Sequence, residues 1–232
     1  MKPQSARPRY LDAITALFVT TLVVSNIIAG KQVAFTATIV LPAAVILFPL
    51  TYILADVLTE VYGYQRCRRV IWIGFLCNAV AVIAIAIGGW LRPAGFWDGQ
   101  DAYLRTLGAV PRIVAASFLA YLAGEFVNSF VLAKLKVATS GRMLWLRTIG
   151  STVVGQLIDS GVFITVAFIG VFPSGQVLQL IVAQWLFKVA YETVATPLTY
   201  AVVGWLKRSE GVDHFDTGTD FTPLRMGVPS RG

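Results

Sequence analysis

The chain has 232 residues, of which 56% are hydrophobic and 13% are charged. A soluble domain carries about 25% charged residues, so this composition excludes an ordinary water-soluble fold. The formal net charge of +7 could indicate nucleic-acid binding, but the basic residues lie in short segments between long apolar runs, a pattern typical of membrane topology. We therefore expect the chain to lie in a lipid bilayer and to make no direct contact with nucleic acid.

Long apolar runs predict six transmembrane helices, because a helix needs about 20 residues to cross the hydrocarbon core. In chain order they cover residues 10–29, 34–57, 70–90, 113–133, 148–171 and 177–206. The basic segment before the first run is similar to that of a secretory signal peptide, but the run is too long and lacks a cleavage site of small residues. It should be retained, and the expected fold class is an all-α, polytopic membrane helical bundle.

The end of the first predicted helix carries polar side chains that could bind a ligand on the external side. Asn26, Lys31 and Gln32 supply hydrogen-bond donors, and the small residues Ala29 and Gly30 permit close approach. Lys31 could instead extend to the interface between lipid and water. Both roles stay open for this lysine.

Two prolines interrupt the second apolar run. Pro42 and Pro49 each lack a backbone N–H, which predicts a kink or a broken helix in this region. We expect Gly63 to cap the cytoplasmic end of the run.

The second half of the same run carries a polar face. Tyr52, Asp56 and Glu60 follow one another at intervals of four, so they share one side of a helix near the cytoplasmic boundary. Asp56 lies deeper and is expected to serve a polar cavity together with Tyr52. Glu60 fits equally well a cavity or an exposed helix end beside the arginines that follow.

Basic residues gather on one side of the predicted topology. Fourteen Lys and Arg residues fall on the side of both termini and four on the other, while Lys188 lies within the sixth helix. Since basic residues in short loops favour the cytoplasm, both termini are expected there. Residues 91–112 form an external loop with room for a short surface segment. Residues 1–208 thus form the transmembrane domain, and residues 209–232 form a polar tail that is expected to be disordered.

Charged residues recur at the middle of the last three predicted helices. A charge there costs about 2.5 to 3.5 kcal/mol on insertion scales, so such side chains face a protein interior or a water-filled cavity. Glu125 lies near the midpoint of the fourth helix, Asp159 near that of the fifth, and Lys188 and Glu192 on either side of the midpoint of the sixth. Acids at one depth on three successive helices predict a functional cavity.

Each of these acids belongs to a stripe of polar residues at helical spacing. The stripes contain Ser117, Tyr121, Gly124, Glu125 and Asn128; Thr148, Thr152, Gly155, Gln156 and Asp159; and Gln184, Lys188, Tyr191, Glu192 and Thr199. Such groups could also simply join helices, since polar contacts between helices are ordinary in membranes. Lys188 and Glu192, four apart, could likewise form an ion pair within their own helix.

The acids outnumber the base in this predicted cavity. With Glu125, Asp159, Glu192 and Lys188 all charged, the cluster would carry a net negative charge that is costly away from water. A bound proton, a bound cation or a cationic substrate would each neutralise it. We expect one of the acids to be protonated in the resting state.

Four segments resemble a known family. Ser25–Gln32, Phe48–Gly63, Gly124–Ser129 and Lys188–Glu192 are similar to the bacterial queuosine precursor transporters, and the resemblance extends over roughly residues 10–208. It implies a six-helix protein of the inner membrane that imports 7-cyano-7-deazaguanine or 7-aminomethyl-7-deazaguanine for salvage into the tRNA base queuosine. We expect neither a cofactor nor a metal.

The polar groups suit a guanine-like base. Such a base has two adjacent N–H donors beside a carbonyl acceptor, so a carboxylate can accept from the donors while an amide or ammonium donates to the carbonyl. The possible acceptors are Glu125, Asp159 and Glu192, the possible donors are Asn128, Gln156 and Lys188, and the aromatic residues that either stack on the base or only fill the core are Phe126, Tyr191 and Trp185. A net negative cluster should favour the cationic aminomethyl form.

Two other classes of function stay open. A substrate-capture subunit of an ATP-driven uptake complex would need a docking surface, but Ala13 and Ala16 in the first helix are three apart rather than the four typical of such subunits. An intramembrane enzyme is also conceivable, although the sequence has neither a His-Glu-x-x-His nor a Gly-x-Ser-x-Gly motif. Cys67 and Cys77 have no accompanying histidines and are interpreted as packing residues. Homo-oligomer formation is possible and is not decided by the sequence.

Overall fold

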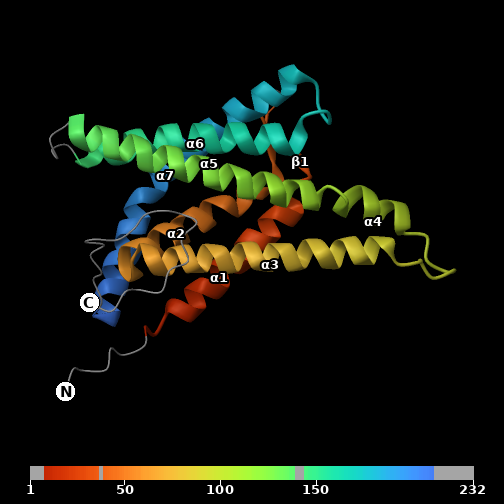
Figure 1. Ribbon diagram of the computed structural model, residues 1–232, viewed down its shortest axis with the longest axis horizontal. Helices are drawn as coiled ribbons and strands as arrows, with labels where there is room; N and C mark the ends of the chain where they lie inside the picture. The colour runs from red at the N-terminus through yellow and green to blue at the C-terminus, as the bar shows by residue number, and fades with distance from the viewer. Residues whose placement is uncertain (1–7, 37–38, 139–143, 212–232) are drawn as a thin grey trace.

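The structure, a computed structural model, describes residues 8–36, 39–138 and 144–211, and excludes the side chains of residues 125–126, 128–130, 132–149 and 151–152. Seven α-helices, a short 3-10 helix and a two-stranded hairpin follow one another (Figure 1). The helices are α1 (Leu11–Ile28), α2 (Phe48–Tyr62), α3 (Tyr64–Trp90), α4 (Gln100–Leu107), α5 (Val110–Ala138), α6 (Leu144–Phe168) and α7 (Ser174–Glu210). The strands are β1 (Gln32–Ala34) and β2 (Val40–Pro42), and the 3-10 helix is η1 (Ala43–Ile46).

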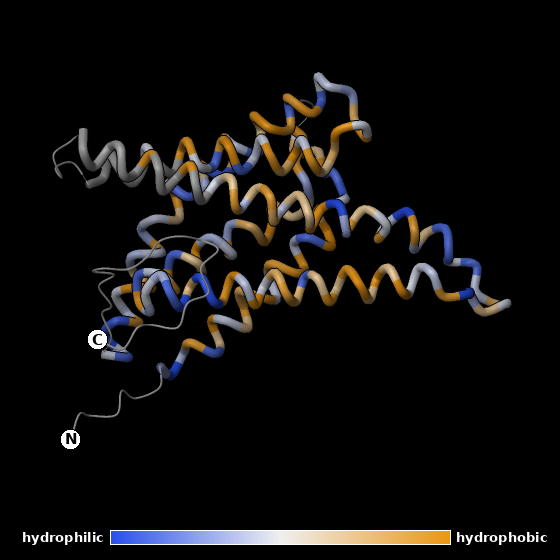
Figure 2. The backbone as a smooth tube through the Cα atoms, viewed as in Figure 1, coloured by the Kyte–Doolittle hydropathy of each residue, from blue (hydrophilic) through white to orange (hydrophobic). Residues whose placement is uncertain are grey.

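The molecule is a helical membrane bundle, as the apolar runs predicted. Among the described residues, four stretches are long and apolar enough to cross a membrane: Leu11–Ile28, Tyr64–Trp90, Gln100–Gly124 and Ser174–Glu210. Val153–Phe168 is a shorter apolar stretch. Figure 2 shows the hydrophobic residues that run along α3 and the polar residues of α4. A total of six spans stays a prediction.

The predicted helix over residues 34–57 is wrong in its first half. This region instead forms β2 and η1, and β1 pairs antiparallel with β2 so that Gln32 lies opposite Pro42. The two prolines explain the difference, because Pro42 ends β2 and Pro49 lies in the first turn of α2, where its missing N–H leaves no helical hydrogen bond unmade. The second proline therefore lies at the start of α2 and not in the interior of a longer helix. Its 15 residues extend for only about 22 Å.

Gly63 separates α2 from α3, which confirms the predicted cap. Its φ of 86° is readily available only to glycine, and its N–H donates to the carbonyl of Thr59. The third helix starts six residues earlier than predicted, at Tyr64, because the arginines of this segment are good helix formers. Arg68 is buried and its guanidinium lies 5.5 Å from the Tyr64 ring centroid.

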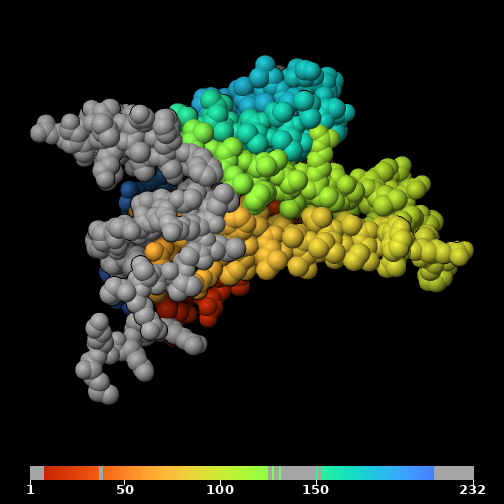
Figure 3. All heavy atoms as spheres, in the orientation of Figure 1, coloured from red at the N-terminus to blue at the C-terminus, as the bar shows by residue number. Residues whose placement is uncertain are grey.

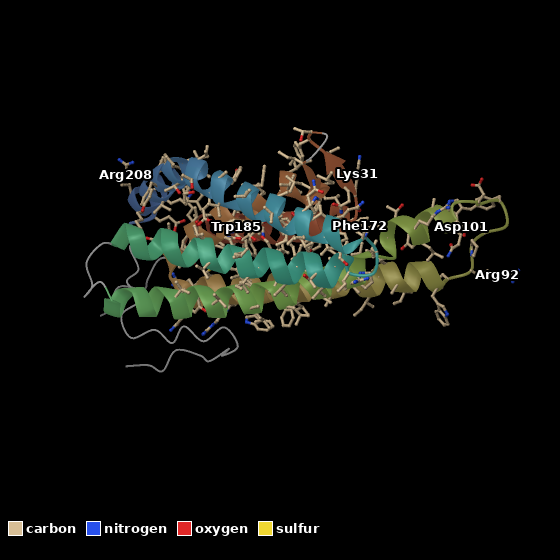
Figure 4. The ribbon with its side chains drawn as sticks, turned by 90° about the horizontal axis from the view of Figure 1, so that it is seen from above. Lys31, Arg92, Asp101, Phe172, Trp185 and Arg208 are labelled. Carbon is tan, nitrogen blue, oxygen red and sulfur yellow. The ribbon has the colours of Figure 1, made fainter. Side chains whose placement is uncertain are left out.

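Hydrogen bonds fix which helix ends lie together. The backbone N–H of Tyr10 donates to Glu210 at 2.7 Å, and the Tyr62 hydroxyl donates to the same carboxylate oxygen at 2.9 Å. The start of α1, the end of α2 and the end of α7 therefore meet at one end of the bundle. Figure 4 places Arg208 at this end, and Lys31 and Phe172 toward the other. This arrangement agrees with the predicted topology, in which both termini and the end of α2 lie on the same side. The cytoplasmic location of both termini stays a prediction.

Two buried apolar clusters lie along the bundle. The inner cluster, near the end that holds Glu210, draws its buried residues from α1, α2, α3 and α7 and includes Phe18, Leu58, Val61 and Leu206. The outer cluster joins the end of α1, η1, α5, α6 and the start of α7 and includes Ile113, Phe163, Ile164 and Leu180. The polar side chains of the last helices lie between these clusters along α7.

Candidate functional site

An ion pair between two helices forms the centre of the candidate site. The Lys188 ammonium of α7 contacts the Asp159 carboxylate of α6, and their side chains are only 8% and 19% exposed. The Tyr52 hydroxyl of α2 donates to the same carboxylate oxygen at 3.4 Å. Three residues that the sequence predicted to bind ligand are thus brought together from three helices.

Aromatic rings enclose the Lys188 ammonium. Its nitrogen lies 5.4 Å from the ring centroid of Tyr52 and 6.0 Å from that of Phe48. Such contacts attract a cation through the ring quadrupole, most strongly where water is excluded. The lysine is therefore held by one carboxylate and two rings.

Residues spaced four apart on α2 and on α7 form the two helix faces that build this site. Phe48, Tyr52 and Asp56 share one face of α2, and Lys188 and Glu192 share one face of α7. These two helices pack against each other, and α7 also packs against α6. Two polar stripes that are distant in the sequence therefore meet along α7.

Small residues let α5 approach α6 directly behind Asp159. A methyl group added at Gly124 would lie 3.0 Å from the Asp159 Cβ and 3.3 Å from the carbonyl oxygen of Gly155. Close packing at glycines is typical of helix pairs in membranes. It fixes the position from which Asp159 projects.

Two further carboxylates lie near this centre. Asp56 is exposed and Glu192 is half-buried, and the Glu192 carboxylate is close enough to both Asp56 and Lys188 for their charges to interact. Neither acid has an ion-pair partner among the described residues. The alternative of a Lys188–Glu192 pair within α7 is wrong, because the lysine bonds Asp159 across the helices instead. Among the described residues, Asp56 and Glu192 are therefore the carboxylates near the site that no ion pair neutralises.

Three buried oxygens on α6 and α7, the helices that carry the ion pair, have no hydrogen-bond partner among the described residues. They belong to Gln156, Ser160 and Gln184. Gln156 was predicted as a site residue and Gln184 only as a member of the polar stripe. Ser160 was missed, although its position next to Asp159 could have indicated it.

Asn26 lies apart from this centre in a second polar network. It is fully buried, its amide donates to Asn78 at 2.9 Å, and the Ser117 hydroxyl donates to the Asn26 oxygen at 2.6 Å. These contacts join α1, α3 and α5. A ligand role for Asn26 stays a prediction, and its position gives it a role in packing.

Removal of this network is expected to affect stability more than transport. Asn78→Ala deprives the Asn26 amide of its acceptor and should cost about 1 kcal/mol, because hydrogen bonds between membrane helices average below that value. A lower melting temperature in detergent with nearly normal uptake is expected. Thr193→Ala, which removes an exposed hydroxyl bonded within its own helix, is the control. Loss of uptake without loss of stability would instead place Asn26 and Asn78 at the ligand.

The other predicted residues lie farther from the ion pair or make local contacts. Lys31 is exposed near the β1–β2 hairpin, away from Trp185 in the middle of the bundle (Figure 4). Gln32 donates to the Ala29 carbonyl at 3.4 Å. Tyr191 stacks on Phe187 with centroids 6.2 Å apart, and the Trp185 indole donates to the Val153 carbonyl at 3.0 Å.

Glu125 and Asn128 lie on α5, and their side chains fall outside the described residues. The backbone places Glu125 directly after Gly124, the residue that packs against Asp159. The role of Glu125 in ligand binding stays a prediction, and its position beside Gly124 supports it.

Two apolar cavities lie elsewhere. One is a groove of about 700 Å³ between α3 and α5, which lie side by side in Figure 3. The other, about 510 Å³, is lined by α6 and by Ile181 of α7. Neither contains a carboxylate. Among the described residues, no group of three or more His, Cys, Asp or Glu side chains could hold a metal ion.

Comparisons with known proteins agree on a transporter. Residues 42–202 match the family described as "Putative vitamin uptake transporter". The chain is 30% identical to the probable queuosine precursor transporter of Bacillus subtilis over 71% of its own length and 72% of that protein. It is 27% identical to the queuosine precursor transporter of Escherichia coli over 67% and 69% of the two chains. No solved structure matches the chain.

Proposed function

Since this chain belongs to the queuosine precursor transporter family, we propose that it imports a 7-deazaguanine precursor of queuosine across the bacterial inner membrane. The observation that carries the proposal is the buried Asp159–Lys188 pair with Tyr52, placed beside two carboxylates that lack an ion-pair partner among the described residues. The precursor itself is not chemically altered during transport.

The polar groups supply what a flat bicyclic base requires. The Lys188 ammonium and the Tyr52 hydroxyl are donors for its carbonyl, and the carboxylates and amide oxygens are acceptors for its N–H groups. Phe48 and Tyr52 offer ring faces on which a base can stack, an interaction that every base shares. Glu125, Asn128, Gln156, Asp159, Lys188 and Glu192 form the proposed site, with Tyr52 and Asp56 from α2.

In this proposal, binding is linked to transport because the base and Asp159 compete for the same hydrogen-bond donors. In this structure Lys188 and Tyr52 both bond Asp159, so a base that offers its carbonyl to them loosens the contact between α2, α6 and α7. The site lies between the outer and inner apolar clusters, each of which can close one side. Rearrangement of helices around such a midplane site is the usual way in which carriers alternate their access.

The proposal is tested by the queuosine content of tRNA. Cells that cannot make the precursor are supplied with it from outside and express this chain or one of its variants. The wild-type chain should restore queuosine, whereas Asp159→Asn, Glu192→Gln and Glu125→Gln should each restore less. Failure of the wild-type chain with both the cyano and the aminomethyl precursor would overturn the proposed cargo, and normal restoration by all three variants would overturn the proposed site.

Reconstitution separates a carrier from a substrate-capture subunit. We expect the purified chain in liposomes to take up labelled precursor without ATP and without a second protein. Binding of precursor without uptake would favour the capture subunit, and a chemically altered ligand would favour an enzyme.

A further inference from the structure

Two buried oxygens beside the ion pair have no partner among the described residues. The Gln184 side chain is 5% exposed and that of Ser160 is fully buried, yet neither oxygen accepts or donates a hydrogen bond to a described residue. Buried polar atoms are nearly always bonded, since an unmade bond is costly away from water. A polar ligand that enters the site would supply the missing bonds.

Both residues lie within one turn of the ion pair and one turn from the outer cluster along their helices. Gln184 lies one turn from Lys188 and one turn from Leu180, a member of the outer cluster, and all three are buried on one face of α7. Ser160 follows Asp159 on α6 and lies one turn from Ile164, which belongs to the same cluster. Along their helices, the two residues are therefore placed between the ion pair and members of the outer cluster.

We propose that Gln184 and Ser160 determine which base is accepted, by bonding the donor edge of its pyrimidinone ring. This inference rests on the proposed function. The Gln184 amide oxygen accepts from the exocyclic amine, and the Ser160 hydroxyl accepts from the adjacent ring N–H. Both atoms accept hydrogen bonds, which matches the two adjacent donors of a guanine-type edge. A base without the exocyclic amine has no donor for the Gln184 oxygen.

The dimensions of α7 agree with this orientation. Gln184 and Glu192 are eight residues apart, which is about 12 Å along the helix axis. Their side chains can converge on a bicyclic ring that lies between them beside Lys188. The ring edge then faces the outer cluster, and the substituent at position 7 faces Glu192 and Asp56.

Competition between two bases tests the assignment. Uptake of labelled 7-aminomethyl-7-deazaguanine is measured against unlabelled competitor, either the same base or its analogue without the 2-amino group. The wild-type chain should prefer the amino base by at least about tenfold, the ratio that one hydrogen bond to a buried group provides. Gln184→Met, which keeps the volume and removes the acceptor, should reduce this preference to below about threefold. Gln184→Glu, which keeps an acceptor oxygen, should retain it.

Ser160→Ala gives a second, independent arm of the test. It removes the hydroxyl and leaves space, so it should weaken the discrimination against the 1-methyl analogue, whose methyl group replaces the ring N–H. Thr196→Val is the matched control, because this hydroxyl is exposed and bonds its own helix. It should leave both preferences unchanged.

The outcomes separate this inference from the proposed function. If the wild-type chain takes up neither precursor, the proposed function fails. A second outcome is that the wild-type chain takes up the base while both Gln184→Met and Ser160→Ala keep wild-type discrimination or reduce the uptake of all compounds equally. In that case the proposed function stands, and the role of Gln184 and Ser160 in selectivity is overturned. Where Gln184→Met does not reach the membrane, the Ser160→Ala result decides alone.

Discussion

Lys188→Met is expected to abolish precursor uptake and to destabilise the protein strongly. The substitution leaves the largely buried Asp159 carboxylate with the Tyr52 hydroxyl as its one side-chain partner among the described residues. Removal of one member of a buried ion pair typically costs about 3 to 5 kcal/mol, because the other charge stays uncompensated. The melting temperature in detergent should fall, and uptake in liposomes should be lost.

A double variant separates stability from transport. Asp159→Asn together with Lys188→Met removes both charges, so the melting temperature should return toward that of the wild type. Uptake should stay absent, since the charged donor for the base carbonyl is still missing and only the Tyr52 hydroxyl is left to donate to it. A single Lys188→Met variant as stable as the wild type would contradict the ion pair, and a double variant with normal uptake would contradict its role in binding.

Glu192→Gln is expected to remove the preference for the aminomethyl precursor over the cyano precursor. Glu192 and Asp56 are the carboxylates near the site that lack an ion-pair partner among the described residues, so a cationic aminomethyl group is attracted to them. A hydrogen bond to a charged group contributes about 1.5 to 3 kcal/mol, which corresponds to about ten- to hundredfold in affinity. Uptake of the aminomethyl form should fall by this factor, while that of the neutral cyano form should change little.

Glu60→Gln is the matched control for this experiment. Glu60 lies one turn beyond Asp56 on α2, is exposed, and is paired with Lys207 at 3.5 Å. Exposed ion pairs contribute little, so its loss should leave both uptake rates unchanged. Equal loss of both precursors in Glu192→Gln would show that the carboxylate does not distinguish charge at position 7.

The long apolar helices could be predicted from the sequence because lipid imposes one requirement on them. A run of sufficient length without charge has few structures open to it other than a spanning helix, and α1 and α3 follow this rule. The region around Pro42 could not be read in this way. Its apolar composition suits a buried strand and a 3-10 helix as well as a spanning helix, and the pairing of β1 with β2 depends on a hydrogen-bond register that apolar composition does not encode.

The candidate site was predictable in its residues but not in its bonds. Burial of Asp159 and Lys188 follows from their position in apolar helices, since a charge in lipid is costly. The sequence suggested Glu192 as the partner of Lys188 because the two are four residues apart. The partner across the helices is chosen by how α2, α6 and α7 pack, and Gly124 of α5 contributes by letting α5 approach Asp159 closely. Asn26 shows the same limit, because its network with Asn78 and Ser117 joins three helices.

The shortness of α2 has a consequence for how the protein is assembled in the bilayer. With 15 residues and two carboxylates, α2 is too short to cross a hydrocarbon core of about 30 Å by itself, and its two acids further oppose independent insertion. The strongly apolar helices on either side, α1 and α3, can enter the membrane independently. We therefore expect biogenesis in two stages, in which these helices are inserted first and α2 is then enclosed between them. The polar face that we propose to bind cargo would be completed only in the second stage.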